Sequence, residues 1–316
     1  MVFPMDCDGD RPIAVFMAHS DVVFPDLEEL PLRVEEGKIF CPGVGDDTAN
    51  AAALLMSVKF LLENDLRPKN MGVLFVINSG EEGLGNLKGV RKIVEDFGDR
   101  MAEFFTFDAF NCHGVDRAVG SRRFLIEATT QGGHSYNDFG RKNAIAVLAQ
   151  MITKLYAIPL PQKGKTTFNV GTIEGGTSVN TIAQKAQMLY EFRSDELSSL
   201  LQMQDAFDAV LEDCKQSDAK ITCTLVGDRP CANDVDEDKM NTLKARAEAA
   251  SIRHFGQSIT YSSGSTDCNI PLFHGIPSLC VGCCFGAGAH THQEYVEIDS
   301  LPKGLGFCME LVLAHF

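Results

Sequence analysis

Two continuous apolar runs near the N-terminus predict buried strands. Residues 13–18 read IAVFMA and residues 71–79 read MGVLFVINS, and uninterrupted apolar runs of this length are typical of strands that are covered on both faces. Between them, residues 48–64 (TANAAALLMSVKFLLEN) are rich in Ala and Leu and have helical spacing. A strand, a helix and a strand in this order predict a parallel α/β sheet.

The pattern changes from about residue 122, where RRFLIEATT alternates like a half-exposed strand. The elements predicted there are a strand at 122–130, a helix at 143–156, strands at 166–173 and 185–194, a helix at 197–214 and a strand at 220–226. The order strand, helix, strand, strand, helix, strand is typical of a ferredoxin-like unit. We therefore predict an inserted α+β domain at residues 121–229.

Beyond residue 230 the pattern of the first domain resumes. It predicts a helix at 236–254, a strand at PSLCVGCC and a closing helix at 301–316. The predicted fold class is α/β: residues 1–120 and 230–316 form a domain with a mixed, mainly parallel sheet and helices on both faces. The ferredoxin-like domain interrupts this discontinuous domain.

Composition narrows the choice of partners and compartment. The 316 residues carry a net charge of -15, which would repel the phosphates of nucleic acid and of anionic membranes. No apolar run approaches the length of about 18 to 20 residues that a membrane span needs. The N-terminal MVFPMDCDGDRP lacks the basic start and apolar core of a secretory signal. With eleven scattered cysteines, we expect reduced thiols and a cytoplasmic location.

Acidic residues and a histidine follow the predicted strands. His19 and Asp21 come after the first strand, Asp46 lies in the glycine-rich GVGDDTAN before the first helix, and Glu81 and Glu82 follow the second strand in NSGEEGLG. Each motif alone is equally consistent with a surface turn, a helix N-cap or a solvated acidic pair. Two acidic turns after two apolar strands make these alternatives weaker, because parallel sheets bind ligands at the carboxyl ends of their strands.

Later segments extend this set. Asp108 lies among phenylalanines in FFTFDAF, and a buried carboxylate is costly unless it is paired or binds a metal. His290 lies in GAGAHTHQEYV, where His292 is its rival. Histidines with carboxylates suit Zn(II), with Co(II) or Mn(II) as alternatives. The C-x-x-C-C motif at residues 280–284 lacks the second pair of ligands that a zinc site needs, so we expect those thiols to pack in the core.

These motifs together resemble a known family. AHSDVV, GVGDDTANAAALL, INSGEEGLG, QGGHSYNDFGRKNAI, GGTSVNTIAQKA, YEFRSD, GSTDCNIPLFHGIP and GAHTHQEYV are similar, in order and nearly end to end, to the zinc metallopeptidases of the peptidase M20 family. That family includes peptidase T-like tripeptidases, glutamate carboxypeptidases, dipeptidases, and the acetylornithine and succinyl-diaminopimelate deacylases.

The resemblance implies two zinc ions per chain and a role for each matching residue. The implied ligands are His19, Asp46 (which bridges the two ions), Glu82, Asp108 and His290. Glu81 matches the general base, and Asp21 matches the carboxylate that orients the imidazole of His19. A cis peptide bond between Asp46 and Asp47 is also implied.

In the inserted domain the resemblance implies residues that meet the substrate. His134 resembles a histidine that reaches the site of a neighbouring subunit and stabilises the oxyanion, and Asn180 and Arg193 resemble substrate-contacting residues. An arginine can hold a substrate carboxylate with two hydrogen bonds. The inserted domain is therefore expected to act as a lid and to form a homodimer.

We predict from these features a dinuclear zinc-dependent hydrolase of peptide or amide bonds that acts on small peptides. The first alternative is a deacylase of N-acyl amino acids from the same family. The second is a non-catalytic binding protein that keeps the fold, since the several dozen residues that usually precede the first strand of the family have no counterpart in this sequence.

Overall fold

The computed structural model describes residues 1–24, 30–215 and 219–316. The chain forms two compact units. The first comprises Met1–Ala118 and Ala232–Phe316, and the second comprises Val119–Cys231. The first unit therefore contains both ends of the chain, and the second is an insertion in it.

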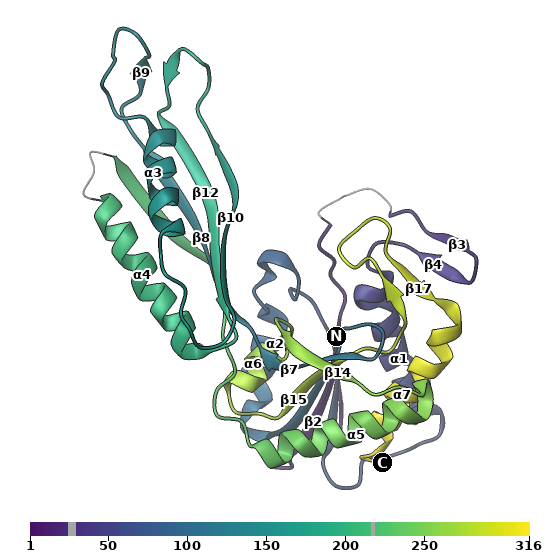
Figure 1. Cartoon of the computed structure of the whole chain (residues 1–316). Helices are drawn as coiled ribbons and strands as arrows, with labels where there is room; N and C mark the ends of the chain where they lie inside the picture. Colours follow the sequence, from purple (N-terminus) through teal and green to yellow (C-terminus); the bar gives the residue numbers. More distant parts are fainter. Residues whose placement is uncertain (25–29, 216–218) are drawn as a thin grey trace. The chain divides into compact units, whose positions relative to one another are not determined.

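A seven-stranded mixed sheet forms the centre of the first unit (Figure 1). Its strands are β1 (Val2–Met5), β2 (Ile13–His19), β5 (Gly72–Asn78), β6 (Met101–Phe107), β7 (His113–Ala118), β14 (Thr260–Gly264) and β15 (Ser278–Val281), in the spatial order β1-β5-β2-β6-β15-β7-β14. Strands β5, β2, β6 and β15 are parallel, and β1 and β7 pair with this group antiparallel. The predicted mixed, mainly parallel sheet is confirmed.

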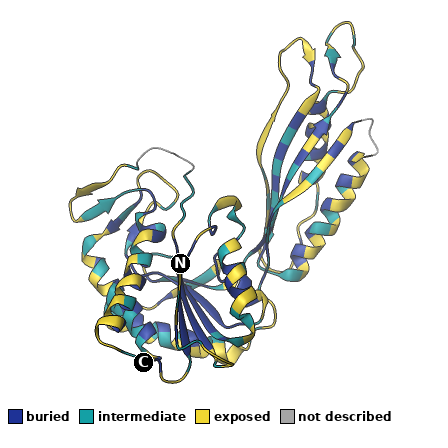
Figure 2. Cartoon of the chain, turned by 180° about the vertical axis from the view of Figure 1, so that it is seen from behind, coloured by how far each residue is buried: buried dark blue, intermediate teal, exposed yellow. Residues whose placement is uncertain are grey.

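Helices cover both faces of this sheet because β2 is apolar at every position but its last. Ala14, Phe16 and Ala18 pack with α1 (Asn50–Glu63), α5 (Glu237–Phe255) and α7 (Leu301–Leu313). The alternate residues of β2 pack on the opposite face with α2 (Lys88–Phe97) and α6 (Asn269–Phe273), as side chains of a strand point to the two faces in turn. Figure 2 shows the central strands of this sheet as mostly buried, and β2 is buried at every position.

A second, four-stranded sheet belongs to the first unit. It consists of β3 (Arg33–Glu35), β4 (Lys38–Phe40), β16 (Gly286–Ala287) and β17 (Tyr295–Glu297), in the order β16-β17-β4-β3. The sheet joins segments near the two ends of the chain. It therefore fixes the loop 288–294 close to the turn 41–46, where Cys41 N–H donates to Glu294 O.

The second unit has the ferredoxin-like arrangement predicted from the sequence. Its antiparallel sheet has the order β10-β12-β8-β13, with β8 (Gly120–Thr129), β10 (Thr166–Gly175), β12 (Lys185–Ser194) and β13 (Lys220–Arg229). Helices α3 (Ala144–Tyr156) and α4 (Leu197–Lys215) pack on one face and enclose a core of their own. A separate two-stranded sheet pairs β9 (Gly133–His134) with β11 (Thr181–Ile182).

No helix among the described residues is long and apolar enough to cross a membrane.

Candidate metal centre

Three neighbouring parallel strands deliver acidic residues and a histidine to one edge of the large sheet. His19 is the last residue of β2, Asp108 directly follows β6, and Glu81 and Glu82 lie in the loop after β5. These strands lie side by side in the order β5-β2-β6. Their carboxyl ends consequently meet at the place where parallel sheets bind ligands.

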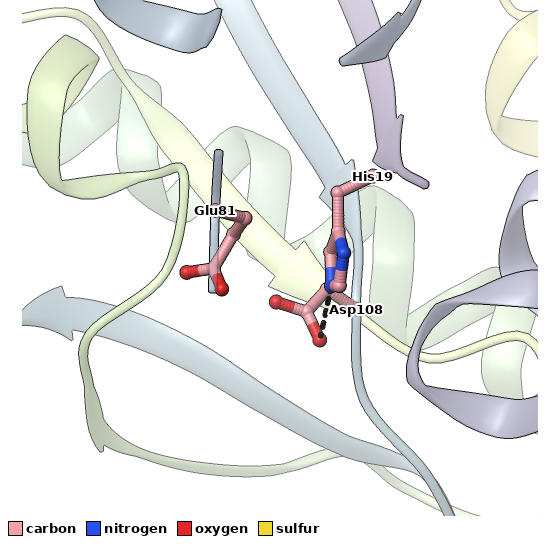
Figure 3. Close-up of side chains that lie close together, drawn as sticks. All are labelled: His19, Glu81 and Asp108. Atoms are coloured by element: carbon pink, nitrogen blue, oxygen red, sulfur yellow. Dashed lines mark ion pairs between the residues drawn. The ribbon is translucent and has the colours of Figure 1, made fainter. Parts of the chain in front are cut away.

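The imidazole of His19 lies at the centre of this group. Its Nε2 is 3.0 Å from Oδ1 of Asp46 and 3.9 Å from Oδ1 of Asp108. Figure 3 shows His19, Glu81 and Asp108 gathered together, with the ion pair between His19 and Asp108 dashed. The side chain of His19 is fully buried.

A second histidine approaches the same carboxylates. Nε2 of His290 lies 3.1 Å from Oδ2 of Asp46 and 3.3 Å from Oε1 of Glu82. The ring of its rival, His292, lies instead against Phe24, with 4.6 Å between ring centroids. Asp46 thus has one oxygen beside each histidine, which is the geometry that a bridging ligand needs.

The donor set fits divalent metal ions. Two groups have ligand atoms within 4.8 Å of one another, one formed by His19, Glu81 and Asp108 and the other by His19, Asp46 and Glu82. Nε2 of His19 and Oε1 of Glu82 are buried and make no hydrogen bond of good geometry, although Asp46 and His290 lie close to them. Buried polar atoms of this kind are costly unless something binds them, and imidazole nitrogen with carboxylate oxygen is a donor set that suits Zn(II).

The charges gathered at the centre also favour a bound cation. Burial and the nearby Asp46 raise the pKa of Glu82 to about 7. Burial lowers the pKa of His19, but Asp108 and Asp46 raise it by more, so the net shift is upward. Several carboxylates held this close repel one another, and a bound cation would offset that repulsion.

Asp21 organises the loop that carries the two glutamates. Its carboxylate accepts hydrogen bonds from the N–H groups of Gly80 (2.9 Å), Glu81 (3.4 Å) and Glu82 (2.9 Å). Nδ1 of His19 lies 3.0 Å from the backbone O of Asp21 and 3.7 Å from its Oδ1. The imidazole of His19 therefore lies closer to the backbone oxygen of Asp21 than to its carboxylate. The family resemblance had implied that the carboxylate orients the ring.

The turn that carries Asp46 has an unusual backbone. The peptide bond between Asp46 and Asp47 is cis, which confirms the expectation from the resemblance. Oδ2 of Asp47 accepts the N–H of His19 at 2.7 Å, and burial raises the pKa of Asp47 well above its ordinary value. Asn50 donates to Gly45 O and accepts from Cys283 N–H. These two hydrogen bonds connect the first residue of α1 to this turn and to the loop that follows β15.

The three site residues predicted in the second unit lie in two different parts of it. Thr181 pairs with His134 in the β9–β11 sheet, and Ser135 N–H donates to Asn180 O at 3.0 Å, so Asn180 and His134 are neighbours. Arg193 lies near the end of β12, opposite Ser121. Its guanidinium donates to both oxygens of Glu191, at 2.9 and 3.0 Å.

One buried residue at the centre was not assigned a role from the sequence. Glu294 follows His290 at the spacing H-x-x-x-E, and its carboxylate accepts hydrogen bonds from the turn that carries Asp46. This spacing is the sequence signal that could have identified Glu294. The partner residues lie about 250 positions earlier in the chain, so the sequence did not reveal the contact.

A family profile and a curated relative both match most of this chain. The sequence profile of the family described as Peptidase family M20/M25/M40 matches residues 15–314. The chain is 26% identical over 312 residues to the uncharacterized protein YqjE of Bacillus subtilis, an alignment that covers 91% of this chain and 77% of YqjE.

Solved structures share the fold. A tripeptidase from Staphylococcus aureus superposes with a TM-score of 0.72 at 23% identity, covering 98% of this chain and 83% of that one. The YxeP protein of Bacillus subtilis, described as a dinuclear metal binding peptidase from the M20 family, superposes with a TM-score of 0.64 at 17% identity, covering 100% of this chain and 85% of that one.

Proposed function

Since the chain belongs to the peptidase family M20/M25/M40 and is an enzyme of the metallopeptidase class, we propose that it hydrolyses small peptides with two zinc ions. The observation that carries this proposal is the position of Asp46, whose two carboxylate oxygens lie 3.0 and 3.1 Å from the Nε2 atoms of two different histidines. A carboxylate placed in this way can bridge two metal ions.

The proposed ligands divide into two sets that share Asp46. His19 and Asp108 form the first set with it, and Glu82 and His290 form the second. When bound, the two ions would polarise the scissile carbonyl and lower the pKa of the attacking water. Co(II) or Mn(II) would supply the same chemistry with the same ligands.

Glu81 is the proposed general base. The residue is 5% exposed, and its backbone N–H donates to the carboxylate of Asp21, as do the N–H groups of the residues on either side. A carboxylate oxygen of Glu81 takes the proton of the attacking water and passes it to the nitrogen of the leaving amine. Asp21 thus holds the loop that carries Glu81 through the backbone of residues 80–82.

His134 is the proposed stabiliser of the oxyanion. The backbone N–H groups of Tyr136 and Asn137 donate to its Nδ1, at 3.2 and 3.4 Å. The neutral imidazole must therefore carry its proton on Nε2, which makes that nitrogen a hydrogen-bond donor. A donor of this kind suits the negative charge that develops on the carbonyl oxygen in the transition state.

We further propose that the inserted domain forms a homodimer and brings His134 to the metal centre of the partner subunit. Asn180, next to His134, and Arg193 would contact the substrate. A guanidinium binds a carboxylate with two parallel hydrogen bonds, as Arg193 does here with Glu191. A substrate carboxylate that takes the place of Glu191 would be bound in the same way, and both peptides and N-acyl amino acids carry one.

A panel of substrates tests the proposal. Zinc-loaded protein is assayed with tripeptides and dipeptides beside N-acetyl and N-succinyl amino acids. Hydrolysis of peptides supports the peptidase, and hydrolysis confined to acyl amino acids supports the deacylase. Zinc-loaded, folded protein that hydrolyses none of them would support a non-catalytic binding protein.

A cytoplasmic location is also part of the proposal. All eleven cysteines are free thiols, and a reducing compartment keeps thiols in this state. Cys280, Cys283 and Cys284 are buried in the cores of the first unit. Fractionation of the native host, followed by detection with an antibody, would locate the protein directly.

A further inference from the structure

Glu294 is a buried carboxylate whose two oxygens are both occupied by backbone donors. It lies immediately before β17 and is 1% exposed. Oε2 accepts from Gly43 N–H at 2.7 Å, and Oε1 accepts from Gly45 N–H at 2.8 Å and from Asp46 N–H at 2.9 Å. Hydrogen bonds to an ionised acceptor are about twice as strong as neutral ones.

The turn that donates these N–H groups is closely packed at Gly45. A Cβ on Gly45 would lie 2.0 Å from Cε1 of Phe110 and 3.1 Å from Cγ1 of Val296. Removing the carboxylate of Glu294 would leave the buried N–H groups of Gly43 and Gly45 and the part-buried N–H of Asp46 without their acceptor, and each such group is costly. The turn is therefore expected to shift if the acceptor is lost.

The turn matters because it holds the residue that both histidines approach. Asp46 donates its N–H to Glu294, while its own carboxylate lies 3.1 Å from His290. His290 precedes Glu294 by four residues in a loop that is closed by backbone hydrogen bonds from Thr291 N–H to Gly288 O and from Glu294 N–H to Thr291 O. One side chain thus connects the loop of His290 to the turn of Asp46.

We propose that Glu294 is a positioning residue of the metal centre, which fixes Asp46 relative to His290 before any metal binds. The inference rests on the proposed function, in which these two residues hold a metal ion. Asp21 supplies a parallel on the other side of the centre, because its carboxylate holds the backbone of residues 80–82 in the same manner. Glu294 acts through the backbone of the turn, since both of its carboxylate oxygens accept backbone N–H groups.

Zinc titration of chelator-stripped protein tests this role. Glu294→Gln keeps the size of the side chain but puts an amide NH₂ where one oxygen accepts backbone N–H groups. We expect the zinc dissociation constant to rise by about 10- to 100-fold, the usual effect of losing a residue that orients metal ligands. The matched control is Glu297→Gln, the same change on an exposed residue of β17, which should leave the constant unchanged. A folded Glu294→Gln protein with wild-type zinc affinity would overturn the proposal.

Glu294→Asp covers the case in which the glutamine variant does not fold. It keeps the negative charge but shortens the reach by one methylene, so it should fold, by circular dichroism, and still bind zinc more weakly than the wild type. Wild-type affinity in this variant would also overturn the proposal.

Amide hydrogen exchange separates this inference from the proposed function. In metal-free protein, the amides of Gly43, Gly45 and Asp46 should exchange faster in Glu294→Gln, or in Glu294→Asp, than in the wild type. The amides of residues 80–82, held by Asp21, should not change. If the wild type binds no zinc, the proposed function fails, yet the exchange data still decide whether Glu294 holds the turn; equal exchange in variant and wild type contradicts that role.

Discussion

The adjacent glutamates Glu81 and Glu82 have different surroundings, which is the basis for giving them different roles. Glu82 lies 3.3 Å from Nε2 of His290, and its pKa is raised to about 7 by burial and by Asp46. Glu81 lies with His19 and Asp108 in the other group of potential ligands. Substitution of each residue can therefore separate the base from the ligand.

Glu81→Gln should lower kcat by about 10²- to 10⁴-fold, the usual contribution of a general base, and leave two zinc ions per chain. Glu82→Gln should instead lower the zinc content, because it replaces a charged ligand by a neutral one. The measurements are steady-state kinetics and elemental analysis of the same samples. Loss of zinc in Glu81→Gln, or unchanged turnover, would contradict the assignment.

Glu103 gives a prediction about pH. Burial raises its pKa, but contacts with His315, at 2.9 Å, and Arg246 lower it by more, so the net shift is below the ordinary value of 4.5. A carboxyl with a lowered pKa in the folded state stabilises that state above pH 4.5, and this contribution disappears as the pH falls through the folded-state pKa.

Melting curves of chelator-stripped protein measure this contribution. Glu103→Gln should melt at a lower temperature than the wild type at neutral pH, and the difference should narrow as the pH falls below 4.5. Glu35→Gln, on an exposed strand, is the control and should melt like the wild type throughout. A difference for Glu103→Gln that stays constant with pH would show that its charge is not involved.

Site residues that lie in a recognisable local sequence pattern could be predicted from the sequence. Residues whose role depends on contacts with distant parts of the chain could not. Glu81 and Glu82 were visible because they follow an apolar strand in a glycine-flanked loop. The choice between His290 and His292 needed the fold, because both occur in one short loop and only the structure shows His292 against Phe24. Glu294 joins segments that are about 250 residues apart, a separation at which no local pattern exists.

Among the elements, the turn Val44–Ala49 before α1 is the one on which the proposed site depends most. Asp46 and Asp47 within it have non-helical backbone angles. The turn lies against the ring of Phe110 at Gly45, where no side chain fits. Its shape is therefore determined by packing as much as by its hydrogen bonds.

Gly45→Ala tests this dependence on packing. A Cβ at this position would overlap the ring of Phe110, so we expect the free energy of unfolding to fall by about 1–3 kcal/mol and zinc to bind more weakly. Gly171→Ala is the control, because its Cβ would meet its nearest neighbour, Nδ2 of Asn169, at an ordinary 3.7 Å. Denaturant unfolding and zinc titration of both variants would measure the effects, and equal behaviour of the two would refute the packing argument.

Long apolar runs made the central elements predictable. β2, β5 and the helices α1, α3 and α4 lie within a few residues of their predicted bounds, because each has a continuous or periodic apolar pattern. Short edge strands such as β1 and β3 were missed, since three or four residues carry no period. α2 was also missed: its KGVRKIVEDF has only ten residues and follows a glycine-rich loop.

At the scale of the whole molecule, each unit has its own hydrophobic core. The core of the second unit is built from residues of that unit alone. This matters for the proposed homodimer, in which the inserted domain of one subunit would supply His134 to the metal centre of the other.

Mixing two inactive variants tests whether His134 acts between subunits. His134→Ala lacks the oxyanion donor and Glu81→Gln lacks the base, so each homodimer should be nearly inactive. After subunit exchange, random pairing gives hybrid dimers in half of the population, each with one intact site, and activity should return to roughly a quarter of wild type. Activity that stays at the level of the unmixed variants would place His134 in the site of its own chain or outside the reaction.

His19, Asp46, Glu82, Asp108 and His290 are proposed to hold two metal ions together. Elemental analysis of chelator-stripped protein, reloaded with zinc and freed of unbound metal by gel filtration, tests this proposal most directly when wild type is compared with Asp46→Ala. We expect two zinc ions per wild-type chain and loss of tightly bound zinc in a folded Asp46→Ala variant, because Asp46 is proposed to bind both ions. A wild-type chain that retains no zinc, or an Asp46→Ala variant that retains both ions, would contradict it.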